Sequence, residues 1–316
     1  MNSGPDGRFI KVGLIDSLYN LSFDSDHEIA ERQNFVASTE ADTTGHGIGV
    51  FALLQHYCKD ATFHLYRTIA EDRLFTPQNM LKALDAARNA GVDLLNVSAG
   101  KHRPDCNQNC RLCVAAKRII NDGVCVVAGA GNRRRDEPLS LFCPALQDDV
   151  ISVGAYEAVC TTDVGGEQPL HRQTPTIRPN GSYWLSPPSE SDGWYGYPRD
   201  HYCGYLGCTP DISCENNRLE RPWERNISYQ RGQPDVLAPC HQLDTTSDGE
   251  PFLASGTSYA APIVTGSLAM ILGELFNRGK NPNPKQIQRA IVGETVPIDK
   301  GPVGKLNVEA VLNRLS

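Results

Sequence analysis

The sequence predicts an α/β fold, a three-layer sandwich with a central, mostly parallel sheet. Short apolar runs alternate with stretches of helical periodicity, which is the pattern of a parallel sheet covered by helices on both faces. The chain has 316 residues, of which 40% are hydrophobic and 21% charged. This length and composition indicate a globular protein, and we expect one domain over residues 1–316 with a single insertion.

The predicted elements follow one another in a regular order. Apolar runs predict strands at Phe9–Ile15, Thr62–Tyr66, Leu94–Val97, Val124–Ala128 and Val150–Gly154. Helical periodicity predicts helices at His46–Tyr57, Pro77–Asn89, Asn109–Asn121, Thr257–Phe276, Pro284–Gly293 and Val308–Leu315. Thr76 followed by Pro77 is typical of a helix start, because threonine caps the first turn and proline lacks the N–H that would be unpaired there.

Residues 164–233 interrupt this alternation. They are rich in Pro, Gly, Tyr, Trp and Cys and show neither a helical nor a strand period. A structureless loop of this length is uncommon in a compact domain, and its aromatic residues argue against disorder. We therefore expect a folded elaboration of the core, which could also serve as a surface for docking a partner protein.

Charge and hydropathy exclude several partners. The net charge of −7 argues against nucleic-acid binding, which relies on Lys and Arg to neutralise phosphates. The longest apolar run, around Leu268–Leu272, is too short for a membrane span, and no signal peptide precedes Phe9. We expect a cytoplasmic protein with no nucleic-acid or membrane partner; a secreted protein, or a domain excised from a longer chain, is the alternative.

Three short motifs carry residues suited to nucleophilic catalysis. Asp16 ends the first strand, His46 stands between two glycines at a helix start, and Ser258 opens the longest helix in a Gly-Thr-Ser motif. In open parallel sheets, active sites lie outside the carboxyl ends of the strands, where these motifs are expected. A serine hydroxyl needs a base to become a nucleophile, and a carboxylate can orient that base.

With these motifs in this order, the sequence resembles the subtilisin-like serine peptidases. The resemblance covers nearly the whole chain apart from the insertion. It includes LLNVSAG at 94–100, VVAGAGN at 126–132, VISVGA at 150–155 and PDVLAP at 234–239. It implies a subtilisin-like fold and an endopeptidase that acts on a peptide or protein substrate and requires no cofactor.

The resemblance also implies a role for each site residue. Ser258 would form the acyl-enzyme, His46 would be the general base, and Asp16 would orient the imidazole. The Asn132 side chain and the Ser258 backbone N–H would bind the oxyanion. Two segments would form the walls of the specificity pocket, and a third would pair with the substrate backbone. The substrate-binding residues implied are Ser98, Ala99, Gly100, Ala128, Gly129, Ala130, Arg133, Arg73 and Leu74.

Basic residues suggest a substrate preference. Three arginines, starting at Arg133, follow Asn132, and Lys101 follows the other wall of the pocket. Guanidinium groups at the pocket mouth would favour acidic residues before the scissile bond, whereas a solvated basic loop would favour none. Two other functions stay open, a peptide ligase or macrocyclase and a regulatory module that binds partners through residues 164–233.

The eleven cysteines raise a separate question. Cys106, Cys110 and Cys113 have the spacing C-x3-C-x2-C, which would place the three thiols on one face of a helix turn. Such thiols could bind structural zinc or an iron–sulfur cluster, with a fourth ligand from the insertion. Disulfides to the insertion are favoured over a metal, and simple buried thiols are the third interpretation.

Overall fold

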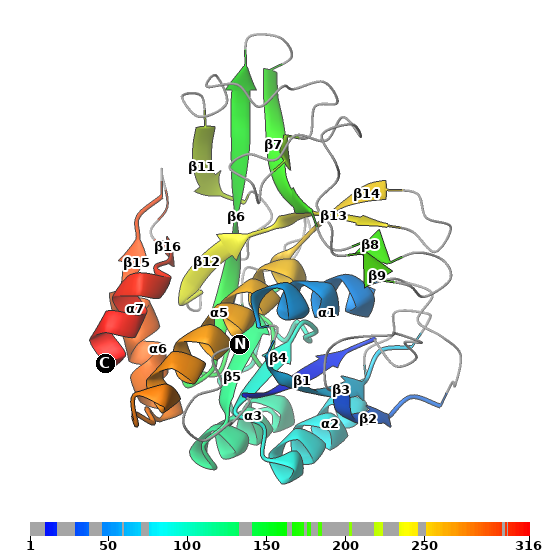
Figure 1. Cartoon of the computed structure of the whole chain (residues 1–316). Helices are drawn as coiled ribbons and strands as arrows, with labels where there is room; N and C mark the ends of the chain where they lie inside the picture. Colours follow the sequence, from blue (N-terminus) through cyan, green and yellow to red (C-terminus); the bar gives the residue numbers. More distant parts are fainter. Residues whose placement is uncertain are drawn as a thin grey trace.

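The computed structural model of the chain has a twisted sheet with helices on both faces (Figure 1). The structure describes residues 10–17, 29–37, 46–58, 60–70, 76–132, 141–162, 166–173, 176–177, 183–184, 202–203, 218–223, 234–245, 251–298, 301 and 303–316. The parallel part of the sheet consists of β2 (Ile29–Asn34), β3 (Thr62–Arg67), β1 (Lys11–Asp16), β4 (Leu94–Val97), β5 (Cys125–Gly129), β6 (Ile151–Thr162) and β12 (Val236–Pro239), in that spatial order. The predicted α/β class is therefore confirmed.

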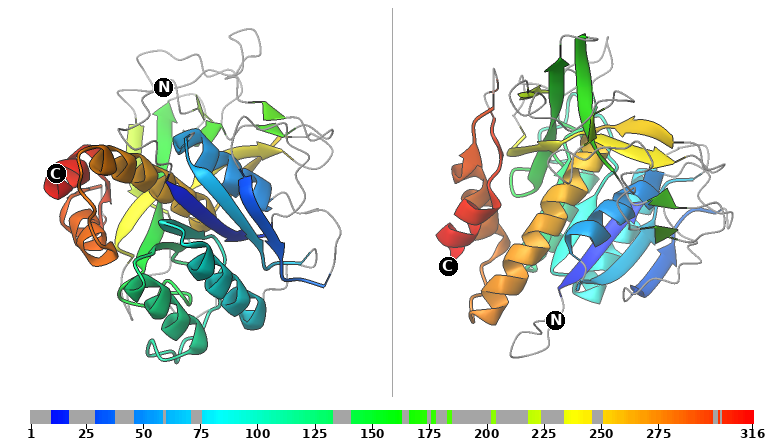
Figure 2. Two further views of the ribbon diagram at one scale, coloured as in Figure 1. Left: turned by 60° about the horizontal axis from the view of Figure 1, so that its bottom comes forward. Right: turned by 45° about the horizontal axis from the view of Figure 1, so that its top comes forward.

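Helices cover the two faces in pairs. They are α1 (His46–Tyr57), α2 (Pro77–Ala90), α3 (Arg111–Asn121), α5 (Thr257–Asn277), α6 (Pro284–Gly293) and α7 (Val308–Leu315). Helices α2 and α3 lie on one face and α1 and α5 on the other, with α6 and α7 beside α5 (Figure 2). The boundaries agree with the predicted helices to within two residues at either end.

Strand β1 shows why the sheet needs both layers of helices. Its side chains alternate between faces, so Val12 and Leu14 join the apolar cluster under α1 and α5, whereas Ile15 joins the cluster under α2 and α3. After the first residue every position of β1 is buried. Burial on both sides is typical of a parallel strand between helix layers and explains its continuous apolar sequence.

Local signals set both ends of α2, and the start follows the prediction. The Thr76 side chain accepts a hydrogen bond from the Asn79 backbone at 3.3 Å, and Pro77 is the first helical residue. Gly91 ends the helix in the left-handed region, with a φ of 62°. A glycine there avoids the strain that a side chain would cause.

Several strands escaped the sequence analysis. Strand β2 lies at the sheet edge and alternates between more and less exposed residues, so its sequence, IAERQN, lacks an apolar run. Strand β12 was missed as well. The remaining strands are β7 (Gly166–Gln173), β8 (Thr176–Ile177), β9 (Tyr183–Trp184), β10 (Tyr202–Cys203), β11 (Arg218–Pro222), β13 (His241–Thr245), β14 (Pro251–Ser255), β15 (Thr295–Val296) and β16 (Lys305–Leu306). Most of these are short, and they pair through backbone groups that an apolar pattern does not reveal.

The described part of the insertion extends the main sheet. Strand β6 continues to Thr162, and both β7 and β11 pair with it in the antiparallel direction. The long ribbon formed by β6 and β7 projects from the helical layers in Figure 1. A strand can therefore form in this region without an alternating apolar pattern. Strand β7 is an example, because its eight residues, GEQPLHRQ, include several polar residues and a proline.

Helix α5 is longer and more apolar than the predicted run around Leu268–Leu272 suggests. A stretch of 18 residues within its 21 has a mean hydropathy of 1.4, enough by length and composition to cross a membrane. However, 78% of that stretch is buried inside the fold, as expected for the core helix of a globular domain.

Candidate active site

Asp16 and His46 meet at the carboxyl edge of the sheet. Strand β1 ends at Asp16, α1 begins at His46, and the His46 Nδ1 atom lies 2.8 Å from Asp16 Oδ1. Asp16 is 1% exposed, whereas the His46 side chain is 31% exposed. Because a carboxylate only accepts hydrogen bonds, Nδ1 carries the proton of a neutral ring. Nε2 is then the basic nitrogen of His46.

Ser17 holds this pair together and was missed by the sequence analysis. Its backbone N–H donates to Asp16 Oδ1 at 2.7 Å, and its hydroxyl donates to the same oxygen at 3.1 Å. The Ser17 Oγ atom also accepts a hydrogen bond from the Gly47 backbone at 3.0 Å, at the start of α1. Ser17 therefore links the carboxylate to the helix that carries His46. A hydroxyl residue directly after the strand-ending acid was the available signal.

The start of α5 lies beside the start of α1. The rings of His46 and Tyr259 make an edge-on contact with their centroids 5.4 Å apart. Ser258 immediately precedes Tyr259, is half-buried, and is the second residue of α5. The structure therefore places the serine one residue away from a ring that contacts the imidazole. The positive end of the α5 dipole is directed to the same place.

A proline within α5 changes the hydrogen bonding of Ser258. Pro262 has no N–H, so it cannot donate to the Ser258 carbonyl four residues earlier in the helix. The Ser98 hydroxyl donates to that carbonyl instead, at 2.8 Å. Ser98 thus satisfies the backbone group that the proline leaves unpaired.

The Ser98 hydroxyl belongs to a buried polar network between β4 and α5. It accepts a hydrogen bond from Asn96 Nδ2 at 2.8 Å. The Asn96 Oδ1 atom in turn accepts one from the Thr265 hydroxyl at 2.9 Å. Asn96 and Thr265 are fully buried and Ser98 is 4% exposed. Buried polar groups are costly unless they are paired, so this network specifies how α5 sits on the sheet.

Asn132 is oriented by the residue before the serine. Its Oδ1 atom accepts hydrogen bonds from the Thr257 backbone N–H at 2.9 Å and the Thr257 hydroxyl at 3.2 Å. The Thr257 hydroxyl itself accepts one from the Gly131 backbone at 3.1 Å. With its oxygen engaged, the Asn132 side chain keeps its NH₂ group as the donor for a ligand. This is the group that an oxyanion needs.

Gly256 makes room for that amide. A Cβ atom at this position would lie 3.1 Å from Asn132 Nδ2, a closer contact than side chains normally make. Glycine therefore lets the chain before α5 approach the amide.

The two predicted pocket walls lie on neighbouring strands. The Ser98–Gly100 and Ala128–Ala130 segments continue from β4 and β5, which pair through Val97 and Ala128. The Ser98 side chain is buried, and its hydroxyl is engaged with the Ser258 carbonyl of α5. Arg73, Leu74 and Arg133, which were also predicted to bind substrate, lie outside the described residues.

Residues 142–143 form a third segment, which connects the two walls through backbone hydrogen bonds. The backbones of Lys101 and Cys143 exchange two hydrogen bonds, each 2.9 Å long. The Phe142 N–H donates to the Ala130 carbonyl at 2.9 Å. Residues 142–143 therefore hold the wall that ends at Gly100 and the wall that ends at Ala130 in a fixed relation.

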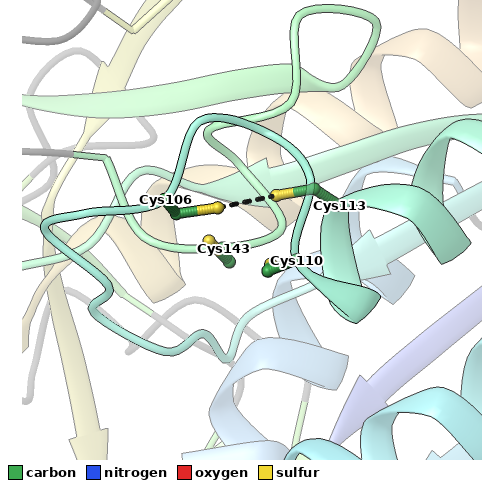
Figure 3. A group of neighbouring side chains, drawn as sticks. All are labelled: Cys106, Cys110, Cys113 and Cys143. Carbon is green, nitrogen blue, oxygen red and sulfur yellow. Dashed lines mark hydrogen bonds between the residues drawn. The ribbon is translucent and has the colours of Figure 1, made fainter.

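Four cysteine side chains gather behind these walls. The sulfur atoms of Cys106, Cys110, Cys113 and Cys143 all lie within 4.8 Å of one another. Figure 3 shows that they converge from the loop after β4, the start of α3 and the segment before β6. The four thiols are free, so the favoured disulfides from Cys106, Cys110 and Cys113 to the insertion are absent from the structure.

Two details of the cysteine prediction need correction. Helix α3 begins only at Arg111, so Cys106 and Cys110 precede it and the three thiols do not share a helix face. They converge because residues 101–110 form a folded loop, with a left-handed residue at Gln108 (φ 63°). The fourth thiol comes from Cys143, outside the insertion.

Hydrogen bonding makes the thiols of this cluster unequal. A hydrogen bond from Cys113 lowers the pKa of the Cys143 thiol to about 6. The same contact, together with burial, raises the pKa of Cys113. Burial alone raises the pKa of Cys58, which lies in the apolar core away from the cluster.

Comparisons with known proteins agree with this architecture. Residues 25–313 match the model of the subtilase family, Peptidase_S8. No curated protein matches the sequence.

Three solved structures illustrate the structural similarity. The prenylagaramide maturation protease PagA is 20% identical, with a TM-score of 0.62 over 97% of this chain and 93% of that one. A mutant protease domain of PatA is 20% identical, with a TM-score of 0.64 over 97% and 94% of the two chains. A lanthipeptide protease is 19% identical, with a TM-score of 0.56 over 99% and 89%. At these identities the likeness shows the fold alone.

Proposed function

Because the chain belongs to the subtilase family of serine-type peptidases, we propose that it is an endopeptidase that cleaves peptide bonds through an acyl-enzyme on Ser258. The observation that carries this proposal is the 2.8 Å contact between buried Asp16 and His46, next to the start of α5. This contact pairs a carboxylate with an imidazole beside the helix that carries the serine, which supports an arrangement for nucleophilic catalysis.

In the proposed reaction, His46 Nε2 takes the proton of the Ser258 hydroxyl as its oxygen attacks the substrate carbonyl. The resulting imidazolium is stabilised by Asp16, which accepts from Nδ1 and stays ionised. His46 then gives the proton to the leaving amine, and the acyl group stays on Ser258. Water, activated by the same imidazole, releases the acyl group and restores the serine.

The tetrahedral intermediate of each step carries a negative oxygen. We assign its two donors to the Asn132 NH₂ group and the Ser258 backbone N–H. Thr257 supports the assignment of Asn132, because it engages the Asn132 oxygen and leaves the NH₂ group to donate.

The names of the structural neighbours guide the choice of substrate. Two are maturation proteases of the peptides prenylagaramide and patellamide, and a third is a lanthipeptide protease. We propose that this chain likewise cuts a precursor peptide, with acidic residues favoured before the scissile bond. Lys101, which is exposed at the end of one wall, supports a basic pocket mouth.

Labelling with a fluorophosphonate tests the nucleophile. We expect covalent label on Ser258 in the wild-type protein and none in Ser258→Ala, as measured by peptide mapping. Ser267→Ala is the matched control, because Ser267 is a buried serine of the same helix with no proposed role. Label at another residue, or undiminished peptide turnover by Ser258→Ala, would contradict the proposal.

A peptide library tests the reaction and the preference. Hydrolysis adds one water to the summed product masses, whereas transfer to an amine, as in a macrocyclase, adds none. Peptides with Asp or Glu before the cut should show about tenfold higher kcat/KM than those with Leu or Phe. This ratio corresponds to the free energy of about one hydrogen bond to a charged group. Equal rates would remove the acidic preference while leaving the peptidase assignment intact.

A further inference from the structure

The cluster of Cys106, Cys110, Cys113 and Cys143 has no part in the proposed peptidase chemistry. Three of these side chains are buried, and Cys110 is half-buried. Cysteines that serve only as small apolar side chains are expected to be scattered through the core, as Cys58, Cys125 and Cys240 are. Four that converge from three separate segments require another explanation.

The spacing of the sulfur atoms fits one small metal ion. Zinc–thiolate bonds are about 2.3 Å long, so two thiolates of a tetrahedral site lie about 3.8 Å apart. The Cys106 and Cys113 sulfur atoms are 3.9 Å apart, and no pair in the cluster exceeds 4.8 Å. Small side-chain rotations would bring all four to the tetrahedral spacing.

The same spacing argues against the two alternatives. A disulfide requires sulfur atoms about 2.0 Å apart, and it would use only two of the four thiols in each bond. An iron–sulfur cluster places several iron and sulfide atoms between its cysteine ligands, so those sulfur atoms must stand farther apart than the ligands of a single ion.

The surroundings suit a site made of thiolates. Cys110 caps the N-terminus of α3 and Cys113 lies in its first turn, where the helix dipole favours negative charge. The Gln108 side chain exchanges two hydrogen bonds with Asp148, at 2.5 and 3.1 Å, which pins the loop of Cys106 to the segment that follows Cys143.

We propose that Cys106, Cys110, Cys113 and Cys143 form a structural zinc site, in which each thiol loses its proton and all four thiolates bind one Zn²⁺ ion. Four protein ligands leave no open position, so the ion stabilises the fold and takes no part in chemistry. The site would brace the backs of the two pocket walls, because the Cys143 backbone pairs with Lys101 and Phe142 holds Ala130. This bracing role, unlike the metal site, rests on the proposed function.

Metal analysis of the full chain tests the site without any substrate. Protein purified with reductant, zinc supplementation and no chelator should retain about one zinc per chain. Replacing zinc with Co²⁺ should give the sulfur-to-cobalt charge-transfer absorption and the visible bands of a tetrahedral thiolate site.

Two variants make the test specific. Cys110→Ser alters the least buried ligand, so the protein should still fold, and it should lose zinc to a competing chelator at least tenfold more readily than the wild type. Cys58→Ser is the matched control, because its hydroxyl can replace the thiol that contacts the Leu54 carbonyl at 2.9 Å. It should retain zinc like the wild type.

Several results would overturn the proposal. These are the absence of retained zinc in reduced wild-type protein, equal zinc retention by Cys110→Ser, iron with acid-labile sulfide in the purified chain, or a non-reduced mass that lacks two hydrogens for each of two disulfides. Since metal content is measured without peptide or fluorophosphonate, failure here leaves the proposed peptidase untouched. Failure of Ser258 labelling likewise leaves the zinc site untouched.

Discussion

The proposed active site and the cysteine cluster are built by opposite means. At the active site, Asp16, Ser17, Asn132 and Thr257 are held by hydrogen bonds between protein groups, so the geometry exists without a ligand. In the cysteine cluster, the side chains contact one another as thiols, as in the 3.9 Å contact between Cys106 and Cys113, and a thiol is a much weaker donor and acceptor than the groups of the active site. The comparison teaches that hydrogen bonds within the chain preorganise the proposed active site, whereas a bound ion would fix the positions of the four thiols in the cysteine cluster.

The largest effect that separates the two regions concerns turnover. His46→Ala should lower kcat by about 10⁴- to 10⁶-fold, because it removes the proposed general base of a group that acts as a unit. Cys110→Ser should lower it by less than about tenfold, because the proposed role of that residue is only to support the pocket walls. Both variants are compared on one peptide, with folding verified by circular dichroism. A similar loss in both would break the distinction between a chemical site and a structural one.

The next effect concerns the oxyanion donor. Asn132→Ala should lower kcat by about 10²- to 10³-fold with little change in KM, because the donor acts mainly in the transition state. Thr257→Val keeps the backbone N–H but removes the hydroxyl that orients Asn132, and should cost about tenfold. Steady-state kinetics of the two variants measures this ranking. If Thr257→Val were the more harmful, Asn132 would not be the donor.

A smaller effect tests the network that replaces a helical hydrogen bond. Ser98→Ala should lower the free energy of unfolding by about 1–3 kcal/mol, because it leaves the half-buried Ser258 carbonyl without this donor. In a Pro262→Ala background the loss should shrink, since residue 262 then has an N–H that can donate to that carbonyl. Urea unfolding of the four proteins in this cycle gives the coupling energy. Additive losses would show that the two residues act independently.

The smallest effect serves as a reference for both regions. Thr76→Ala removes the N-cap of α2, which lies in neither site, and should lower the free energy of unfolding by about 1 kcal/mol. Peptide turnover and zinc retention should both stay at wild-type values. A change in either one would mean that global stability, and not the local site, controls that measurement.

The sequence by itself determined the class of fold and the identity of the family. Buried parallel strands such as β1 need continuous apolar runs, and helices such as α2 carry their own end signals, so both are visible locally. The glycine-rich motifs around His46 and Ser258 are equally local, because each one shapes its own turn or helix start. The prediction of Asp16, His46, Ser258 and Asn132 as site residues rests on these motifs and on their order along the chain.

Only the tertiary structure decided which distant groups become partners. Cys143 is 30 residues beyond Cys113, and no spacing rule connects the two, since their meeting depends on how residues 141–150 pack behind the walls. The roles of Ser17 and Ser98, and the pairing of β7 and β11 with β6, have the same origin. Such contacts form between backbone and side-chain groups far apart in the chain, so no local pattern of hydrophobicity can encode them.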